Sequence, residues 1–210
     1  MYYNLKRIIL LSLIAFEGMV DSNVNNVNIV VLGSLNLDIF LKVQRLPQVG
    51  ETIASSEVVK AYGGKGANQA VAAARLGGTV SMLGQVGEDN DGKEYANYLK
   101  TKENINTDGI NVAKDTYTGQ AYIMSQHDGD NSIIISGGAN MAFKEGDEFS
   151  AEWNDIIMKA DVLLLQREVP EFVNVLAVRA ANKAKENGSK IQVILDIGGR
   201  DDDKFSLEVI

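Results

Sequence analysis

Asn36 and Asp38 are the first pair of side chains in this sequence whose types and spacing could do chemistry. They lie in the segment 33–38 (GSLNLD), directly after the β-rich run 28–33. Side chains two positions apart in an extended chain point the same way. The amide can donate and accept, whereas the carboxylate only accepts, so the pair suits a ligand with adjacent hydroxyl groups. The alternative is an Asx-type turn that caps the strand.

The segment 63–68 (GGKGAN) stands where a strand is expected to give way to a helix. Glycines allow close backbone approach and positive φ angles. A helix start offers free N–H groups and the positive end of its dipole to a ligand. Lys65 adds a cation and Asn68 a side-chain amide. The spacing matches neither a Walker A loop nor GxGxxG, and the alternative is a tight turn alone.

Glu168 is the third candidate, in the segment 166–170 (QREVP) that follows an apolar strand. Taken alone, it fits a surface charge in a loop equally well. Ligands of open α/β sheets bind beyond the carboxyl ends of the strands, and all three clusters fall at such ends. Together they predict a carbohydrate pocket in which carboxylates accept from hydroxyls and amides and Lys65 donate. No base with a pKa near neutrality accompanies them, so they are expected to bind rather than react.

The elements that must position these residues alternate between strand and helix. Buried strands are expected at 28–33, 79–86, 162–166 and 191–196, and helices at 67–76, 91–102 (with Asp91 as N-cap), 147–160 and 170–187. This alternation predicts a doubly wound, mostly parallel α/β sheet covered on both faces. The segment 37–43 continues as a further extended piece. The β-rich pieces at 52–62 and 121–136 break the alternation and are interpreted as a small separate sheet, a candidate lid.

Composition narrows the classes of function. The chain has 210 residues, 45% of them hydrophobic, and a formal net charge of -8, which argues against disorder and against a nucleic-acid surface. It contains no cysteine, which excludes disulfides, thiolate zinc sites and cysteine nucleophiles. His127 is the single histidine, so a histidine-rich metal site is excluded.

Residues 1–27 are interpreted as an extension that precedes the domain at 28–210. Lys6 and Arg7 come before a nine-residue apolar run, 8–16, which is far shorter than the ~20 residues that span a bilayer. No stable membrane span is therefore expected. The basic start and short apolar run are also typical of a secretory signal. A cytoplasmic location is the expectation, with secretory or organellar targeting left open.

Several segments resemble the PfkB carbohydrate-kinase family, in particular its ribose-phosphorylating members. The most specific is the uninterrupted block 63–77 (GGKGANQAVAAARLG). The others are 33–38 (GSLNLD), 47–52 (PQVGET), 84–92 (GQVGEDNDG), 118–121 (TGQA), 138–140 (GAN) and 168–170 (EVP). The resemblance runs from about residue 28 to residue 196, which is nearly all of the chain.

The resemblance implies a doubly wound sheet with a β-lid that pairs with the lid of a second subunit, giving a homodimer. It also implies ATP-dependent phosphorylation of the 5-hydroxyl of D-ribose, with Mg²⁺ and a monovalent cation (K⁺) as cofactors. The lid would comprise 52–62 and 121–136 and would exclude water. The implied sugar-binding residues are Asn36, Leu37, Asp38, Gly64, Lys65, Gly66, Ala67, Asn68 and Glu168.

The sequence departs from the family in two places. Asp196 stands where many members have an asparagine near the nucleotide phosphates, and a carboxylate there repels phosphate unless a metal bridges them. The family's Gly-Ala-Gly-Asp motif, which carries the general base and the anion hole, does not occur before Ile210. The adenine and monovalent-cation sites would also lie beyond this residue, so this chain is expected to carry the sugar-binding half and no catalytic residue.

Three interpretations therefore stay open. In the first, the chain belongs to an active kinase whose polypeptide continues past Ile210. In the second, it is a catalytically inactive protein that binds sugar or pairs lids. In the third, it belongs to a kinase for another furanose, such as deoxyribose.

Overall fold

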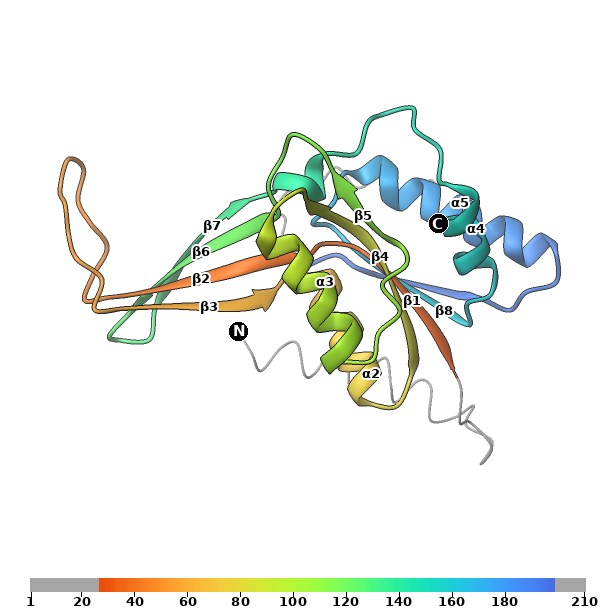
Figure 1. Ribbon diagram of the computed structural model, residues 1–210, viewed down its shortest axis with the longest axis horizontal. Helices are drawn as coiled ribbons and strands as arrows, with labels where there is room; N and C mark the ends of the chain where they lie inside the picture. The colour runs from red at the N-terminus through yellow and green to blue at the C-terminus, as the bar shows by residue number, and fades with distance from the viewer. Residues whose placement is uncertain (1–26, 199–210) are drawn as a thin grey trace.

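A five-stranded parallel sheet forms the centre of the larger part of the molecule (Figure 1). The computed structural model describes residues 27–198. The strand order is β5-β4-β1-β8-β9, and every neighbouring pair is parallel. The strands are β1 (Asn28–Leu32), β4 (Thr79–Gly87), β5 (Ile110–Ala113), β8 (Val162–Gln166) and β9 (Gln192–Asp196). From β1 the chain proceeds outward to β4 and β5, and from β8 outward to β9, so the predicted doubly wound arrangement is confirmed.

Helices cover both faces of this sheet because β1 is apolar on both sides. Val30 and Leu32 pack with α4 (Ala151–Met158) and α5 (Glu171–Glu186). Val31, between them, packs on the other face with α2 (Lys65–Arg75) and α3 (Asn90–Lys102). Burying each of these side chains stabilises the fold by about 1.5–3 kcal/mol. This two-sided burial keeps the end of β1 fixed between two helical layers.

A second, four-stranded sheet projects from the first (Figure 1). Its order is β3-β2-β6-β7, with β2 parallel to β6 and the other pairs antiparallel. The strands are β2 (Asn36–Val43), β3 (Glu57–Gly63), β6 (Gly119–Gln126) and β7 (Asn131–Ser136). A short 3₁₀ helix, η1 (Gly138–Met141), follows β7. The segment that carries Asn36 and Asp38 is thus a strand of the projecting sheet.

The projecting sheet is fastened to the larger part at the base of β3 and of β6. Tyr62 of β3 stacks on Tyr95 of α3 with ring centroids 4.3 Å apart, and the Tyr95 hydroxyl donates to the Gly63 carbonyl at 2.7 Å. The Asp89 carboxylate accepts from the backbone N–H and the hydroxyl of Thr118, each at 2.7 Å. These contacts fix the end of β3 and the start of β6 beside α3.

Several element boundaries differ from the sequence predictions. Asp89, not Asp91, caps α3, and its side chain accepts from the N–H of Gly92 at 2.7 Å. The strand expected from residue 52 begins at Glu57, because 44–56 form the long connection between β2 and β3. The short strand β5 was not predicted, since its four residues give no periodic signal. The predictions for residues 1–26 lie outside the described residues.

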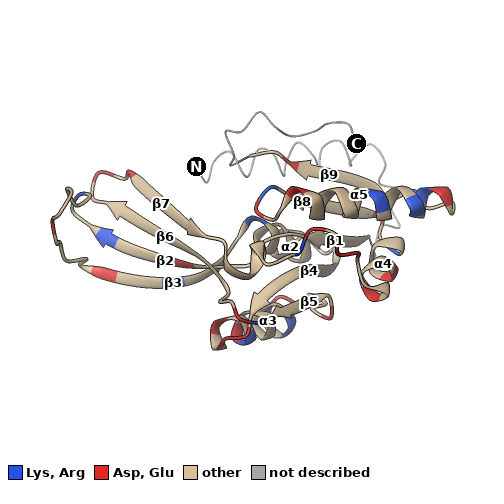
Figure 2. Ribbon diagram, turned by 90° about the horizontal axis from the view of Figure 1, so that it is seen from above, with Lys and Arg blue, Asp and Glu red and all other residues tan. Residues whose placement is uncertain are grey.

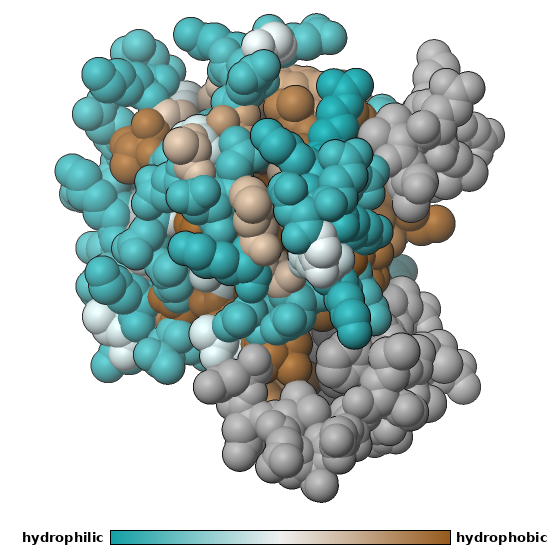
Figure 3. All heavy atoms as spheres, turned by 90° about the vertical axis from the view of Figure 1, so that its right-hand side faces the viewer, coloured by the Kyte–Doolittle hydropathy of each residue, from teal (hydrophilic) through white to brown (hydrophobic). Residues whose placement is uncertain are grey.

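Charges and apolar side chains are distributed unevenly over the surface. Figure 2 shows few charged residues along the projecting sheet, where Lys42 of β2 and Glu57 of β3 form a pair at 3.9 Å. The end of the molecule away from that sheet is mostly hydrophilic (Figure 3). Within residues 27–198, every helix is too short or too polar to cross a membrane.

Candidate functional site

The candidate site begins where β1 and β8 end side by side. The chain moves outward from these two neighbouring strands in opposite directions, and ligands of doubly wound sheets bind at such a switch point. Ser34 follows β1 and Glu168 follows β8, and the Ser34 hydroxyl donates to Glu168 Oε2 at 2.6 Å. Two of the segments singled out from the sequence therefore meet at the position where this fold binds ligands.

The start of α2 is joined to both of these residues. The backbone N–H of Lys65 donates to Glu168 Oε2 at 2.9 Å. The N–H of Gly66 donates to the Ser34 hydroxyl at 3.2 Å, and that of Ala67 donates to the Ser34 carbonyl at 3.0 Å. The expectation that these N–H groups would be free for a ligand is therefore wrong: a carboxylate and a serine already satisfy them. Within residues 27–198, Glu168 Oε1 has no such partner and is the oxygen left for a ligand.

Close backbone contact explains two of the glycines. Gly64 precedes α2 with φ of 91°, and a Cβ there would lie 2.9 Å from both the Asn36 nitrogen and the Ser34 carbonyl oxygen. A Cβ on Gly66 would lie 2.6 Å from the Ser34 nitrogen. Any larger residue would push α2 away from the end of β1. The glycines therefore bring the helix start against the strand ends.

Asn36 and Asp38 lie on one face of β2, as the sequence predicted. Their partners across β3 and β6 are small, and the Asp38 and Asn36 side chains occupy the room left at the two glycines: Gly63, Ala61, Gly119 and Ala121. Burial raises the pKa of Asp38 to about 6, and the negative charge of Glu168 adds to this effect. Asp38 and Glu168 are therefore close enough to repel, and groups that donate hydrogen bonds to either would relieve the repulsion.

The other predicted sugar-binding residues are less uniform. Lys65 is half-buried at the first position of α2, and Asn68 is exposed in the same first turn. Ala67 is fully buried, and Leu37 lies on the opposite face of β2 from Asn36, opposite Tyr62. The side chains of Ala67 and Leu37 are thus core contacts.

Asp196, the predicted nucleotide-binding residue, is linked to α2 by side-chain amides. Its Oδ2 lies 3.4 Å from Gln69 Nε2, and Gln69 Oε1 accepts from Gln166 Nε2 at 2.7 Å. Asp196 Oδ1 accepts from the N–H of Gly198 at 2.9 Å. The chain of contacts runs from the end of β9 to the helix that carries Lys65 and Asn68. In residues 27–198, no group of three or more acidic, histidine or cysteine side chains could hold a metal ion.

Two residues that make hydrogen bonds in the site have no role in the sequence predictions. Ser34 was read only as part of the 33–38 segment, although its hydroxyl joins Glu168 to Gly66. Asn140 was read only as part of a family motif, although it contacts both Leu35 and Asn36. Neither residue is charged, and neither belongs to a periodic hydrophobic pattern. The sequence therefore indicates a role for them only through their place in segments shared with the family.

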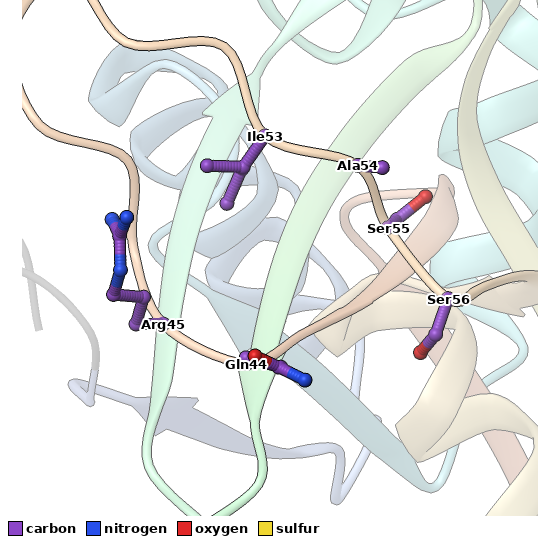
Figure 4. A pocket seen from close by; sticks show the side chains of 6 residues that line it. All are labelled: Gln44, Arg45, Ile53, Ala54, Ser55 and Ser56. Atoms are coloured by element: carbon purple, nitrogen blue, oxygen red, sulfur yellow. The ribbon is translucent and has the colours of Figure 1, made fainter.

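A separate pocket of about 380 Å³ lies in the connection between β2 and β3 (Figure 4). It is lined by Gln44, Arg45, Ile53, Ala54, Ser55 and Ser56. All of these residues belong to one connection, and none belongs to the three sequence clusters. The pocket is therefore distinct from the site at the strand ends.

Comparison with known proteins identifies the family. Residues 26–206 match the model of the pfkB family of carbohydrate kinases, which covers most of the chain. The chain belongs to this family. Among pfkB relatives, it is 41% identical over 175 residues to the ribokinase of Arabidopsis thaliana, covering 82% of this chain and 44% of the relative. It is 35% identical over 182 residues to the ribokinase of Dictyostelium discoideum, covering 87% of this chain and 55% of the relative.

Solved structures of pfkB proteins share the fold. The structure of Arabidopsis thaliana ribokinase complexed with ribose and ATP aligns with a TM-score of 0.75 at 40% identity, covering 84% of this chain and 55% of that one. The ribokinase of Giardia lamblia aligns with a TM-score of 0.73 at 28% identity, covering 84% of this chain and 52% of that one. The chain thus spans about half the length of the relatives it matches.

Proposed function

We propose that this chain supplies the sugar site of a kinase that transfers phosphate from ATP to D-ribose, forming D-ribose 5-phosphate. The observation that carries the proposal is the meeting of Asn36, Asp38 and Glu168 with the start of α2 at the switch point of the sheet. Two carboxylates and an amide suit the hydroxyl groups of a sugar. The likeness to an Arabidopsis ribokinase solved with ribose and ATP supports the choice of sugar and nucleotide.

The nucleotide part of the proposal rests on Asp196. We propose that this residue faces the phosphate end of ATP, where its carboxylate would hold Mg²⁺, since a carboxylate and a phosphate would otherwise repel. The kinase is also proposed to bind a monovalent cation, at a site outside residues 1–210. The sequence Gly-Ala-Gly-Asp does not occur within these residues. We therefore expect a purified 1–210 polypeptide to bind ribose without transferring phosphate to it.

Pairing of the projecting sheets in a homodimer is also proposed. The face of the sheet that carries Asp38 also carries Val59, Ile133 and Ile135, each about half exposed. An exposed apolar face of this kind typically marks an interaction site. In the dimer, this apolar face of each copy would be covered by the same face of the other copy. The second copy would also close the sugar site beside Asp38.

Calorimetric titration tests the choice of sugar. D-Ribose, 2-deoxy-D-ribose and D-fructose would each be titrated into the 210-residue chain at pH 8, with Asp38→Asn as the site variant. D-Ribose is expected to bind tightest, and Asp38→Asn is expected to weaken it about tenfold or more, as for loss of a charged hydrogen bond. Tighter binding of deoxyribose or fructose would favour the kinase for another furanose. Measurable ribose 5-phosphate from the 1–210 polypeptide with ATP would contradict the expectation of binding alone.

A further inference from the structure

Asn140 of η1 is buried beside the start of β2, on the face that carries the Asn36 side chain. It is 1% exposed, and its side chain makes three hydrogen bonds to β2 and the residue before it. Asn140 Oδ1 accepts from the N–H of Leu35 at 2.9 Å. Asn140 Nδ2 donates to the Leu35 carbonyl at 3.0 Å and to Asn36 Oδ1 at 2.7 Å. The residue thus links the backbone before β2 to a candidate ligand-binding side chain.

The backbone of Leu35 dictates which way the Asn140 amide points. A backbone N–H can only donate and a carbonyl can only accept, so Asn140 must turn its oxygen to the first and its nitrogen to the second. The second proton of Asn140 Nδ2 then points at Asn36. Whatever atom of Asn36 receives it must be an acceptor, which is Oδ1 and not Nδ2. The orientation of the Asn36 amide therefore follows from the fixed roles of the backbone groups, although the two amide atoms differ little in shape.

Gly119 of β6 makes this contact sterically feasible. It pairs with Asn36 across the sheet, and a Cβ on it would lie 2.1 Å from Asn140 Nδ2 and 2.4 Å from Asn36 Oδ1. The two amides therefore meet where a side chain would otherwise stand. Asn36 is 4% exposed, so its amide has little room to turn over.

We propose that Asn140 is a positioning residue that fixes Asn36 as a hydrogen-bond donor toward the sugar, a role that rests on the proposed function. Within residues 27–198, Asn36 Nδ2 has no hydrogen-bond partner. Asp38, on the same face, can only accept when ionised. The pair thus shows a ligand one fixed donor and one fixed acceptor. A hydroxyl can satisfy both, whereas a ligand group that only donates is rejected at Asn36.

A double-mutant cycle separates positioning from general support of the fold. Asn140→Ala is expected to weaken D-ribose binding about tenfold, and Asn36→Ala by a similar or larger factor. If Asn140 acts through Asn36, the double variant binds ribose no more weakly than Asn36→Ala. Thermal melting of each variant checks folding, and Asn154→Ala in α4, remote from the site, is the matched asparagine control. If the double variant instead weakens ribose binding by the product of the two single-variant factors, the proposal is overturned.

A second measurement needs neither sugar nor a variant that must fold. In the ¹⁵N-labelled 210-residue chain, the Asn140 side-chain amide protons are both hydrogen-bonded, whereas those of Asn36 are not. Hydrogen exchange of the Asn36 amide is therefore expected to be at least about tenfold faster than that of Asn140. Equal exchange would overturn the fixed orientation. If the wild-type chain binds no ribose but the exchange rates differ as expected, the proposed function fails and the orientation of Asn36 stands.

Discussion

The carboxylate of Glu168 accepts a hydrogen bond from the backbone N–H of Lys65 at 2.9 Å, although 103 positions separate the two residues. Glu168 thus does for α2 what an N-cap side chain normally does, because the residue at the N-cap, Gly64, has no side chain to offer. The same oxygen accepts from Ser34 at 2.6 Å. One candidate ligand-binding carboxylate therefore holds together the ends of two strands and the start of a helix.

Removal of this cap should reduce stability. Glu168→Ala is expected to lower the free energy of unfolding by about 1–2 kcal/mol, because two partly buried donors lose their acceptor. Glu168→Gln keeps an acceptor oxygen and should cost less. Urea denaturation measures both, with Glu186→Ala, on the exposed end of α5, as the control. A loss in Glu168→Ala no larger than in the control would contradict the capping role.

The raised pKa of Asp38 predicts a specific pH dependence. Its pKa is about 6 in the folded chain against an ordinary value of 3.8, so between these values the folded state binds more protons than the unfolded state. The contribution of Asp38 to the free energy of unfolding therefore falls as pH rises from about 4 to 6. D-Ribose affinity should rise as pH passes through about 6, because the ionised carboxylate of the folded chain accepts from a hydroxyl.

The comparison of wild type with Asp38→Asn isolates this effect from other groups. Glu168 and Tyr95 also interact electrostatically with Asp38, and both residues remain unchanged in the variant. At half-unit steps from pH 4 to 8, chemical denaturation should show a fall in stability between about pH 4 and 6, and ribose titration a step near pH 6, in the wild type alone. The same step in both proteins would assign it to another residue.

Gly66 should be intolerant of even a methyl group. Gly66→Ala places a Cβ 2.6 Å from the backbone nitrogen of Ser34, which cannot move without displacing β1 or α2. We expect a loss of about 1–3 kcal/mol in unfolding free energy and weaker ribose binding. Gly77→Ala is the control: its φ of 96° is strained, but no atom lies within 4 Å, so only stability should fall, by about 1 kcal/mol. Equal ribose affinity in Gly66→Ala and wild type would contradict this account.

Adjacent residues of β7 test the proposed pairing of sheets. Ile135 lies on the face that carries Asp38, and Ile134 lies on the opposite face, while both are more than half exposed. Ile135→Asp should convert a dimer to a monomer, because it places a charge in the proposed apolar interface. Ile134→Asp should leave the dimer intact. Sedimentation velocity at several concentrations distinguishes these results, and a monomeric wild type would refute the pairing.

The layers of the fold could be predicted from local patterns, because apolar strands such as 162–166 and helix-forming runs such as 171–186 each carry their own signal. The meeting of the segments that carry Asn36 and Glu168 also followed from the rule that parallel strands end at one edge, whereas α2 follows β3, an antiparallel strand of the projecting sheet, so this rule does not explain its position. The hydrogen-bond partners could not be predicted. Ser34 and Glu168 satisfy N–H groups of α2, and this depends on the directions of side chains far apart in the sequence. Glu168 lies 134 positions from Ser34 and 103 positions from Lys65.

Residues from β2, α2 and the end of β8 are proposed to form one sugar site. The most direct test is to add D-ribose to the ¹⁵N-labelled chain and follow the amide resonances by NMR. We expect saturable shifts concentrated at residues 34–38, 63–68 and 168, with little change at 44–56, where the separate pocket lies. Shifts centred on 44–56, or no shift at millimolar ribose, would contradict this proposal.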